Sequence, residues 1–220
     1  MDGRVVHARE GRRDEYRPLV SRLCGSSAAG EVLAGLLEQH PFRHCYIADL
    51  DAILGRGGHR GLIENLRGAH PDIEFWVDAG LGDTASRAAW PARLGRPVVG
   101  SESMDDAVAV TGNAILSLDF RGADFLGPRA MLDDAGLWPE DVIVMTLARV
   151  GGALGPDLER LAALRARAPG KNLYAAGGVR GGADLAALER TGAAGVLLAS
   201  ALHDGRLSRT DLAAYRDIPP

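Results

Sequence analysis

Short apolar runs alternate with helical patterns from residue 44 onward, as expected for parallel βα units. Most of these runs are continuous and do not alternate with polar residues, which is typical of strands buried on both faces. Seven strands are predicted: His44–Leu50, Ile73–Ala79, Arg96–Ser101, Asn113–Phe120, Asp141–Leu147, Asn172–Ala176 and Gly195–Ala201. At the N-terminus, Asp2-Gly3 indicates a turn and Arg4–Ala8 a short strand.

Helices are predicted where leucines recur at helical spacing between turn residues. Ser26–His40 has an apolar stripe that stops at Pro41, and Pro156–Ala168 begins with proline and ends before Pro169-Gly170. Gly182–Arg190 and Ser208–Arg216 are the other two predicted helices. Arg9–Arg17 mixes acidic and basic residues and is interpreted as a surface hairpin or loop.

An internal repeat distinguishes between the two folds that such a pattern allows. The stretch from Tyr46 to Gly100 resembles the stretch from Ile143 to Ala199, and the matched glycines keep a nearly constant offset. A duplicated half-barrel predicts such a repeat, whereas a doubly wound open sheet, the alternative fold, does not require it. We therefore expect an α/β protein with one domain over residues 1–220, a (β/α)₈ TIM barrel of two similar half-barrels. Its first strand should be truncated or missing.

Composition excludes several functional classes. The net charge of −4 disfavours nucleic-acid binding, and no apolar run approaches the roughly 20 residues of a membrane span. Cys24 and Cys45 form no metal-ligand or disulfide-scaffold pattern, which fits a reducing cytoplasm. The six histidines show no ligand spacing, so neither a metal nor a cofactor is predicted. No protein partner and no oligomeric state can be predicted.

The active site of such a barrel lies at the C-terminal ends of the strands. Polar residues are predicted at these ends: Asp49, Asp51, Asp78, Ser101, Glu102, Asp119, Arg121, Thr146 and Ser200. Asp119 ends an otherwise apolar strand, so burial should raise its pKa toward the range that suits a general acid. A strand-end aspartate that caps the next loop is the alternative, and for Asp49 both interpretations stay open.

Glycines after the strands predict sites for anions. Gly177 and Gly178 follow a strand and precede a helix, where backbone N–H groups can approach a phosphate, and Ser200 could add a hydroxyl. The first half offers an equivalent set, which consists of Gly80, Gly82, Gly100 and Ser101. Two such sites across one barrel mouth suit a small-molecule substrate with a phosphate at each end.

Several motifs resemble the HisA/HisF superfamily of histidine-biosynthesis barrels, and HisA most. They are Asp2-Gly-Arg-Val-Val6, Ile47-Ala-Asp-Leu-Asp51, Val99-Gly-Ser101, Leu116-Ser-Leu-Asp119 with Arg121-Gly122, Ala175-Ala-Gly-Gly-Val179 and Gly195–Ala201. The resemblance implies an Amadori rearrangement of phosphoribosylformimino-aminoimidazole carboxamide ribotide. Asp119 would protonate the ring oxygen, and Thr146 would lie near the substrate. Asp49, Arg121 and the glycine and serine residues above would bind the ligand and its phosphates.

The sequence departs from this family at several functional positions, which include Gly151-Gly152 after the sixth strand and Ala199-Ser200 in the last loop. The family's second catalytic aspartate lies about two residues before the Asp-Gly turn, so it would fall ahead of Met1. Either the sequence begins too late or the chain lacks this base. Where the family has Gly-Gly-Gly-Ile-Arg, this chain has Asp78-Ala-Gly-Leu-Gly82, and an aspartate would repel a phosphate.

These departures favour a divergent HisA-like paralogue, an isomerase acting on a phosphorylated, ribose-derived ligand. One alternative is a catalytically impaired barrel that binds a phosphorylated ligand or a partner in another pathway, such as one-carbon cofactor metabolism. A third is a HisF-type cyclase or synthase, which would need a surface for a glutaminase partner.

Overall fold

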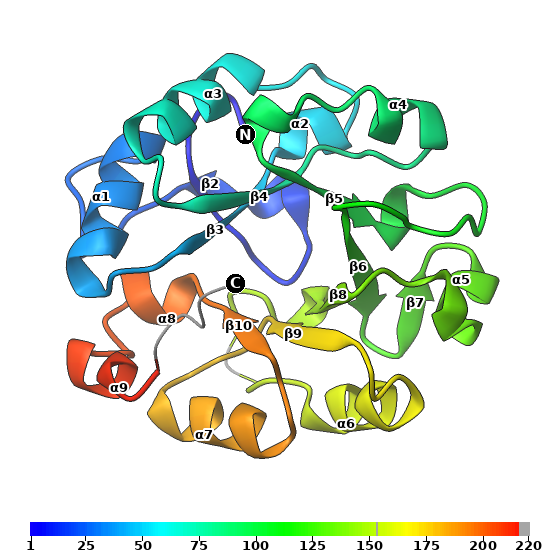
Figure 1. The fold of residues 1–220 in the computed structure, drawn as a ribbon. Coiled ribbons are helices and arrows are strands. Elements are labelled where there is room, and N and C mark those ends of the chain that lie inside the picture. The colour runs from blue at the N-terminus through cyan, green and yellow to red at the C-terminus, as the bar shows by residue number, and fades with distance from the viewer. Residues whose placement is uncertain (153, 216–220) are drawn as a thin grey trace.

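Seven parallel strands form a ring with helices around its outside (Figure 1). The structure is a computed structural model that describes residues 1–152 and 154–215. The strand order is β10-β9-β8-β6-β5-β4-β3, and β7 pairs antiparallel with β6. A doubly wound sheet would reverse its strand order at a switch point, whereas here consecutive parallel strands are always neighbours. The predicted TIM barrel is therefore confirmed.

The elements follow one another as β–α units. The strands are β1 Val6–His7, β2 Arg17–Pro18, β3 His44–Ala48, β4 Glu74–Asp78, β5 Arg96–Gly100, β6 Ile115–Arg121, β7 Asp124–Leu126, β8 Asp141–Thr146, β9 Asn172–Ala176 and β10 Gly195–Leu197. The helices are α1 Ala29–Gln39, α2 Leu50–Ile53, α3 Arg60–Ala69, α4 Thr84–Ala88, α5 Arg129–Asp133, α6 Leu158–Arg167, α7 Gly182–Arg190, α8 Ser200–His203 and α9 Arg209–Ala213.

The ring of strands begins at β3 and ends at β10. Among the described residues, no strand hydrogen bonds to both of these strands. That the first barrel strand is truncated or missing stays a prediction. The short strand expected within Arg4–Ala8 exists as β1, and it pairs antiparallel with β2 in a separate hairpin. Arg13–Glu15 forms a 3-10 turn between the two strands of this hairpin.

Side chains inside the barrel form layers along its axis. At the N-terminal ends of the strands, the Arg96 guanidinium donates hydrogen bonds to Glu74 (3.2 Å) and Asp141 (2.7 Å). Above this charged layer, the rings of Trp76 and Tyr174 meet edge to face, with their centroids 4.9 Å apart. Charged and aromatic side chains thus fill the N-terminal end of the barrel.

The sequence predicts the strands well, except at the ends of the first and last of the seven. The predicted strand His44–Leu50 is wrong beyond Ala48, because Asp49 caps helix α2, which begins at Leu50. Asn172–Ala176 and Gly182–Arg190 are confirmed with both bounds, but the predicted strand Gly195–Ala201 is wrong beyond Leu197. Ser200 opens helix α8 because the chain leaves the sheet after three paired residues and β10 has only β9 beside it. The last predicted helix runs to Arg216, which lies outside the described residues.

No helix in the described part of the chain is long and apolar enough to cross a membrane.

Candidate functional site

Two aspartates face the barrel interior at the C-terminal ends of β4 and β6. Asp78 ends β4 and lies two residues after Trp76, which packs in the interior cluster. Asp119 is near the end of β6, four residues after Ile115 of the same cluster. Because side chains alternate along a strand, both carboxylates point inward. Asp78 is 6% exposed and Asp119 is 4% exposed.

Gly100 ends β5, the strand between these two aspartates. A Cβ atom at Gly100 would lie 3.2 Å from Oδ2 of Asp119 and 3.2 Å from Oδ2 of Asp78. The backbone of Gly100 has φ −75°, which any residue can adopt. What this position requires is therefore space and not an unusual conformation. The missing side chain lets the two carboxylates converge on one point inside the barrel.

Asp119 is held by donors from its own strand and from the end of β5. The Ser117 hydroxyl donates to Oδ1 (2.6 Å), and the backbone N–H of Glu102 donates to Oδ2 (3.2 Å). Burial, together with the smaller effects of the charges of Asp78 and Glu102, raises the pKa of Asp119 to about 8 despite the hydrogen bond from Ser117. At neutral pH this carboxyl group therefore keeps its proton.

Ser101 fixes the backbone beside Asp119. Its hydroxyl accepts the Asp119 N–H (2.9 Å) and donates to the Leu126 carbonyl (2.6 Å) on β7. The predicted ligand-binding residue Ser101 is fully buried and lies next to the predicted acid. Its hydroxyl is already engaged, so its contribution to this arrangement is to join β5, β6 and β7 at the site.

Asp78 has a different set of neighbours. Its Oδ1 accepts the Gly80 N–H (3.1 Å), and the Tyr46 hydroxyl also donates to its carboxylate. Burial raises the pKa of Asp78 to about 6, while the Gly80 N–H, the positive charge of Arg13 and the Tyr46 hydroxyl act against this rise. Asp78 is therefore mostly ionised at neutral pH while its neighbour Asp119 is protonated.

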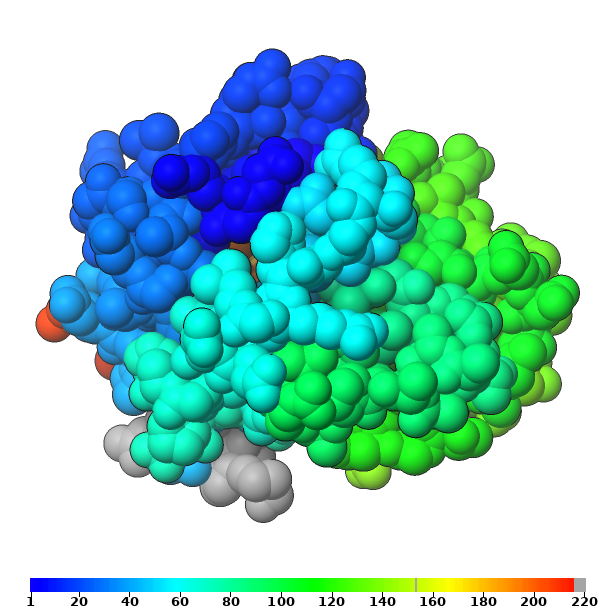
Figure 2. Space-filling view, turned by 90° about the horizontal axis from the view of Figure 1, so that it is seen from above, coloured from blue at the N-terminus to red at the C-terminus, as the bar shows by residue number. Residues whose placement is uncertain are grey.

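The N-terminal hairpin lies over this end of the barrel. The Glu10 N–H donates to the Val150 carbonyl (2.8 Å), which holds the hairpin on the loop after β8. Arg13 pairs with Glu102, the residue whose N–H binds Asp119. Figure 2 shows the first 20 residues, in dark blue, as a raised part of the surface beside the cyan segment of residues 50–60. The hairpin predicted over Arg9–Arg17 thus covers part of the candidate site.

Thr146 is buried at the end of β8. Its hydroxyl accepts a hydrogen bond from the Arg160 guanidinium (3.3 Å), which also donates to the Gly122 carbonyl (2.8 Å). The same guanidinium lies 4.1 Å from the centre of the Phe120 ring. Arg160 therefore ties the end of β8 to the end of β6, the strand that carries Asp119.

The predicted phosphate-binding glycines of the second half are packed tightly. A Cβ atom at Gly178 would lie 2.2 Å from the Gly155 carbonyl oxygen, and one at Gly177 would lie 2.8 Å from the Thr146 carbonyl oxygen. Both glycines have positive φ, +103° for Gly177 and +87° for Gly178. Close contact with the loop after β8 therefore accounts for glycine at both positions, and phosphate binding there stays a prediction. Ser200 lies at the start of α8.

The predicted glycines of the first half also face backbone atoms. A Cβ atom at Gly82 would lie 1.7 Å from the Ser103 carbonyl oxygen, and one at Gly80 would lie 2.9 Å from Ile53 Cα. Both positions need glycine so that the loop after β4 can pack against its neighbours. Phosphate binding by this pair also stays a prediction.

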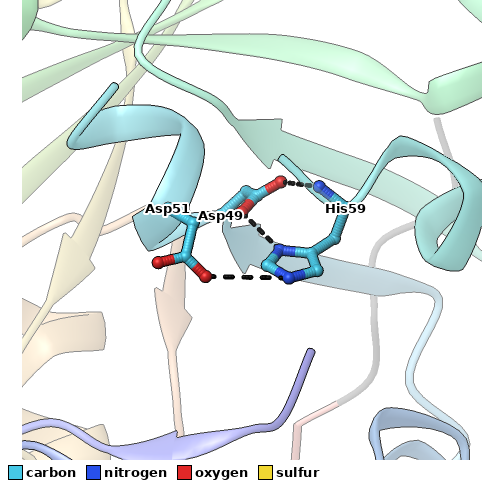
Figure 3. A group of neighbouring side chains, drawn as sticks. All are labelled: Asp49, Asp51 and His59. Carbon is cyan, nitrogen blue, oxygen red and sulfur yellow. Dashed lines mark hydrogen bonds and ion pairs between the residues drawn. The ribbon is translucent and has the colours of Figure 1, made fainter. Parts of the chain in front are cut away.

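Asp49, Asp51 and His59 form a second polar cluster (Figure 3). Asp49 caps α2 and accepts the backbone N–H of His59 (2.6 Å) and its ring Nδ1 (2.9 Å). Asp51 lies 3.6 Å from His59 Nε2 and accepts hydrogen bonds from the Asp2 N–H (2.6 Å) and the Arg56 guanidinium (3.1 Å). The Asp2 N–H and the positive charges nearby lower the pKa of Asp51.

This cluster has the residue types of a metal site, and one ligand atom from each residue lies within 4.8 Å of the others. Its oxygens already accept internal hydrogen bonds, which hold the glycine-rich loop before α3 against α2. A hollow of about 400 Å³ lies next to the cluster, between the dark blue and cyan segments of Figure 2. It is lined by Asp2, Asp51, Arg56, Gly57, Gly58 and His59.

Arg121 follows Asp119 by two residues and is exposed at the end of β6. Its guanidinium makes no hydrogen bond or ion pair with the residues that the structure describes. An exposed cation beside a buried acid can bind a ligand anion, as predicted for Arg121.

Sequence reasoning missed Asp78 and Tyr46 as neighbours of the predicted acid. From the family pattern, Asp78 is expected only to repel a phosphate. Its signal is present in the sequence, because Asp78 lies two residues after Trp76 and so shares the face of an inward-pointing residue. That Gly100 leaves space for both carboxylates depends on three strands at once, and no single stretch of sequence shows it.

Comparison with known proteins shows the family to which this chain belongs. A family model described as "Histidine biosynthesis protein" matches residues 132–208. Phosphoribosyl isomerase A of Streptomyces griseus is 30% identical over 91% of this chain and 86% of its own length. The chain belongs to the HisA family of phosphoribosyl isomerases. Phosphoribosyl isomerase A of Mycobacteroides abscessus is 31% identical, over 77% of this chain and 79% of that protein.

An uncharacterized protein of Methanocaldococcus jannaschii is 27% identical over 94% of this chain and 92% of its own length. The fold and the family thus indicate a barrel of the isomerase type, and the substrate is a separate question.

Proposed function

We propose that this HisA-like protein is an aldose–ketose isomerase that acts on a phosphorylated, ribose-derived ligand by an Amadori rearrangement. One observation carries the proposal. Asp119, which the family resemblance marks as the acid, is a buried carboxyl group whose pKa is raised to about 8. A group that is protonated at neutral pH inside a strand-end site is suited to donate a proton to a sugar oxygen.

The chemistry begins with the sugar ring. Asp119 gives its proton to the ring oxygen, the bond between that oxygen and C1 breaks, and the nitrogen on C1 forms a Schiff base. Loss of the proton on C2 then gives an enaminol, which becomes the aminoketose when C1 gains a proton and the C2 hydroxyl loses one. The proton count of the substrate is unchanged, as an isomerisation requires.

The proposal assigns the remaining predicted residues to ligand binding. Arg121 would pair with a phosphate, and the buried Thr146 would lie near the reacting carbons. The other proposed contacts are Asp49, Gly80, Gly82, Gly100, Ser101, Gly177, Gly178 and Ser200. Support for them comes from their positions at strand ends and in the loops after the strands.

The test is turnover of phosphoribosylformimino-aminoimidazole carboxamide ribotide by the purified protein. We expect turnover by the wild type and a loss of about 10³-fold in Asp119→Asn, the size of a general-acid contribution. Ribotide affinity, measured by calorimetry, should stay within a few-fold. Asp133→Asn, an exposed acid at the end of α5, is the matched control and should keep full activity.

Full activity in Asp119→Asn would reject the acid assignment. Ribotide binding without turnover in the wild type would reject the isomerase and favour a barrel that binds phosphorylated ligands without catalysis. Growth of a histidine auxotroph lacking the isomerase, when it expresses this chain, would place the reaction in histidine biosynthesis.

A further inference from the structure

Asp78 faces the predicted acid from the other side of Gly100 and has no role in the opening of the sugar ring. We propose that Asp78 is a second catalytic carboxylate, which takes the proton from C2 of the sugar while Asp119 donates one to the ring oxygen. This inference rests on the proposed function and deepens it. It concerns a position where the family pattern has glycine, so the resemblance does not supply it.

The geometry gives the two carboxylates a common target. Oδ2 of Asp78 and Oδ2 of Asp119 each lie 3.2 Å from the position of a Cβ at Gly100. They belong to β4 and β6, with only β5 between them. Burial and mutual repulsion disfavour ionisation of both carboxylates, so the pair holds one proton between pH about 6 and about 8.

The neighbours decide which carboxyl group carries that proton. Asp78 accepts hydrogen bonds from the Gly80 N–H and the Tyr46 hydroxyl, which stabilise its charged form. Asp119 also accepts hydrogen bonds, but its burial, followed by the negative charges of Asp78 and Glu102, destabilises its charged form more. Glu102 acts on Asp78 as well, where the positive charge of Arg13 opposes it. Asp119 is therefore the acid and Asp78 the base, in agreement with their pKa values of about 8 and about 6.

The proton transfers balance over one turnover. Asp119 loses its proton to the ring oxygen, and the C1–O bond breaks. Asp78 takes the proton from C2, the C2–H electron pair becomes the C1=C2 bond, and the electron pair of the C1=N bond moves to nitrogen. The enaminol becomes the aminoketose when C1 takes a proton from water and the C2 hydroxyl gives one to water. The pair now holds its proton on Asp78. Return of this proton to Asp119 across the Gly100 gap restores the starting state.

A purely structural Asp78 would serve as a strand-end cap. Asparagine retains the side-chain oxygen that accepts the Gly80 N–H, but it cannot take up a proton. Asp78→Asn therefore preserves the cap and removes the base, while Asp78→Glu keeps a carboxylate at a changed distance. These two variants separate the catalytic role from the structural one.

The first measurement is independent of substrate. Protein labelled with ¹³C at the aspartate carboxyl carbons is titrated by NMR, with Asp78→Asn and Asp119→Asn used to assign the two signals. We expect Asp119 to titrate well above the other aspartates in the wild type and at least one pH unit lower in Asp78→Asn, since the negative neighbour is gone. An unchanged Asp119 titration in that variant overturns the pair.

The second measurement is turnover of the ribotide by the wild type and the variants. We expect turnover in Asp78→Asn to fall by about 10²- to 10⁴-fold, with partial recovery in Asp78→Glu and full activity in Asp133→Asn. Wild-type turnover together with full turnover in Asp78→Asn overturns the role of Asp78 and leaves the proposed isomerase intact. Absence of wild-type turnover overturns the proposed isomerase, and the catalytic role of Asp78 with it, whatever the NMR titration shows.

Discussion

Two regions of the barrel end their strands in different ways. In the first region, β4 and β6 present buried carboxylates, and a glycine on β5 leaves space between them. In the second region, β8 ends in a threonine held by Arg160, and Gly177 and Gly178 follow β9. Both regions therefore have glycines at strand ends, but for different physical reasons.

Gly100 and Gly178 represent this difference. Gly100 has an ordinary φ and faces two carboxylates, whereas Gly178 has a φ of +87° and faces a backbone carbonyl oxygen. The missing side chain of Gly100 leaves space for the two carboxylates, and that of Gly178 leaves space for the backbone carbonyl. Substitution should therefore affect activity at one position and stability at the other.

Among substitutions outside the two aspartates, Gly100→Ala should have the largest effect on turnover. The added Cβ would lie 3.2 Å from an oxygen of each aspartate, tighter than ordinary contact, so both carboxylates must move. Each oxygen must shift by a few tenths of an ångström. We expect turnover of the ribotide to fall by up to about 100-fold, the cost of a displacement of about one ångström. Thermal unfolding should change little. Gly68→Ala on α3, where nothing lies within 4 Å, is the control and should keep full activity.

Gly178→Ala should show the opposite behaviour. The added Cβ would meet the Gly155 carbonyl oxygen at 2.2 Å, and alanine is strained at this φ. We expect a loss of about 2 kcal/mol in the free energy of unfolding, measured by urea denaturation. Activity per folded molecule should stay within a few-fold. If activity per folded molecule falls by much more than a few-fold, Gly178 contributes to ligand binding as well.

Stability should also depend on pH through Asp119. Its folded pKa of about 8 lies above its ordinary value of 3.8, so the folded state binds more protons between these values. The contribution of this group is fully present below pH 3.8 and is lost as pH rises through 8. We expect the free energy of unfolding of the wild type, relative to Asp119→Asn, to fall by up to about 1.4 kcal/mol per pH unit in this window. A flat difference would contradict the raised pKa.

Arg121→Gln should have the smallest effect. An exposed guanidinium contributes little to stability, but it can attract a ligand phosphate. We expect KM for the ribotide to rise about fivefold with kcat almost unchanged, in keeping with the modest strength of exposed charge pairs. Arg129→Gln, whose exposed partner is Asp133 on α5, is the control and should leave KM unchanged. A fall in kcat alone would assign Arg121 a different role.

Much of the fold can be predicted from local sequence. Apolar runs such as Asp141–Leu147 predict strands because a parallel barrel buries both faces of each strand, and the observed β8 differs from that run by one residue. The end of α6 can also be predicted from local sequence, because Pro169-Gly170 follows it and cannot continue the helix. The internal repeat predicts a barrel in preference to an open sheet, since each half supplies similar βα units in the same order.

The candidate site was only partly predictable. The sequence identifies Asp119 because an aspartate interrupts an apolar strand. The role of Gly100 and the partnership of Asp78 depend on the packing of β4, β5 and β6 together. The same limit applies to Asp49, whose bonds to His59 depend on a loop that folds back onto α2.

The charged layer of Arg96, Glu74 and Asp141 limits the routes by which small molecules can reach the two aspartates. Together with the Trp76–Tyr174 contact, it fills the barrel at the end opposite them. The two aspartates therefore lie at the end of the barrel that the N-terminal hairpin partly covers. A movement of this hairpin would change how far their carboxyl groups are shielded from the solvent.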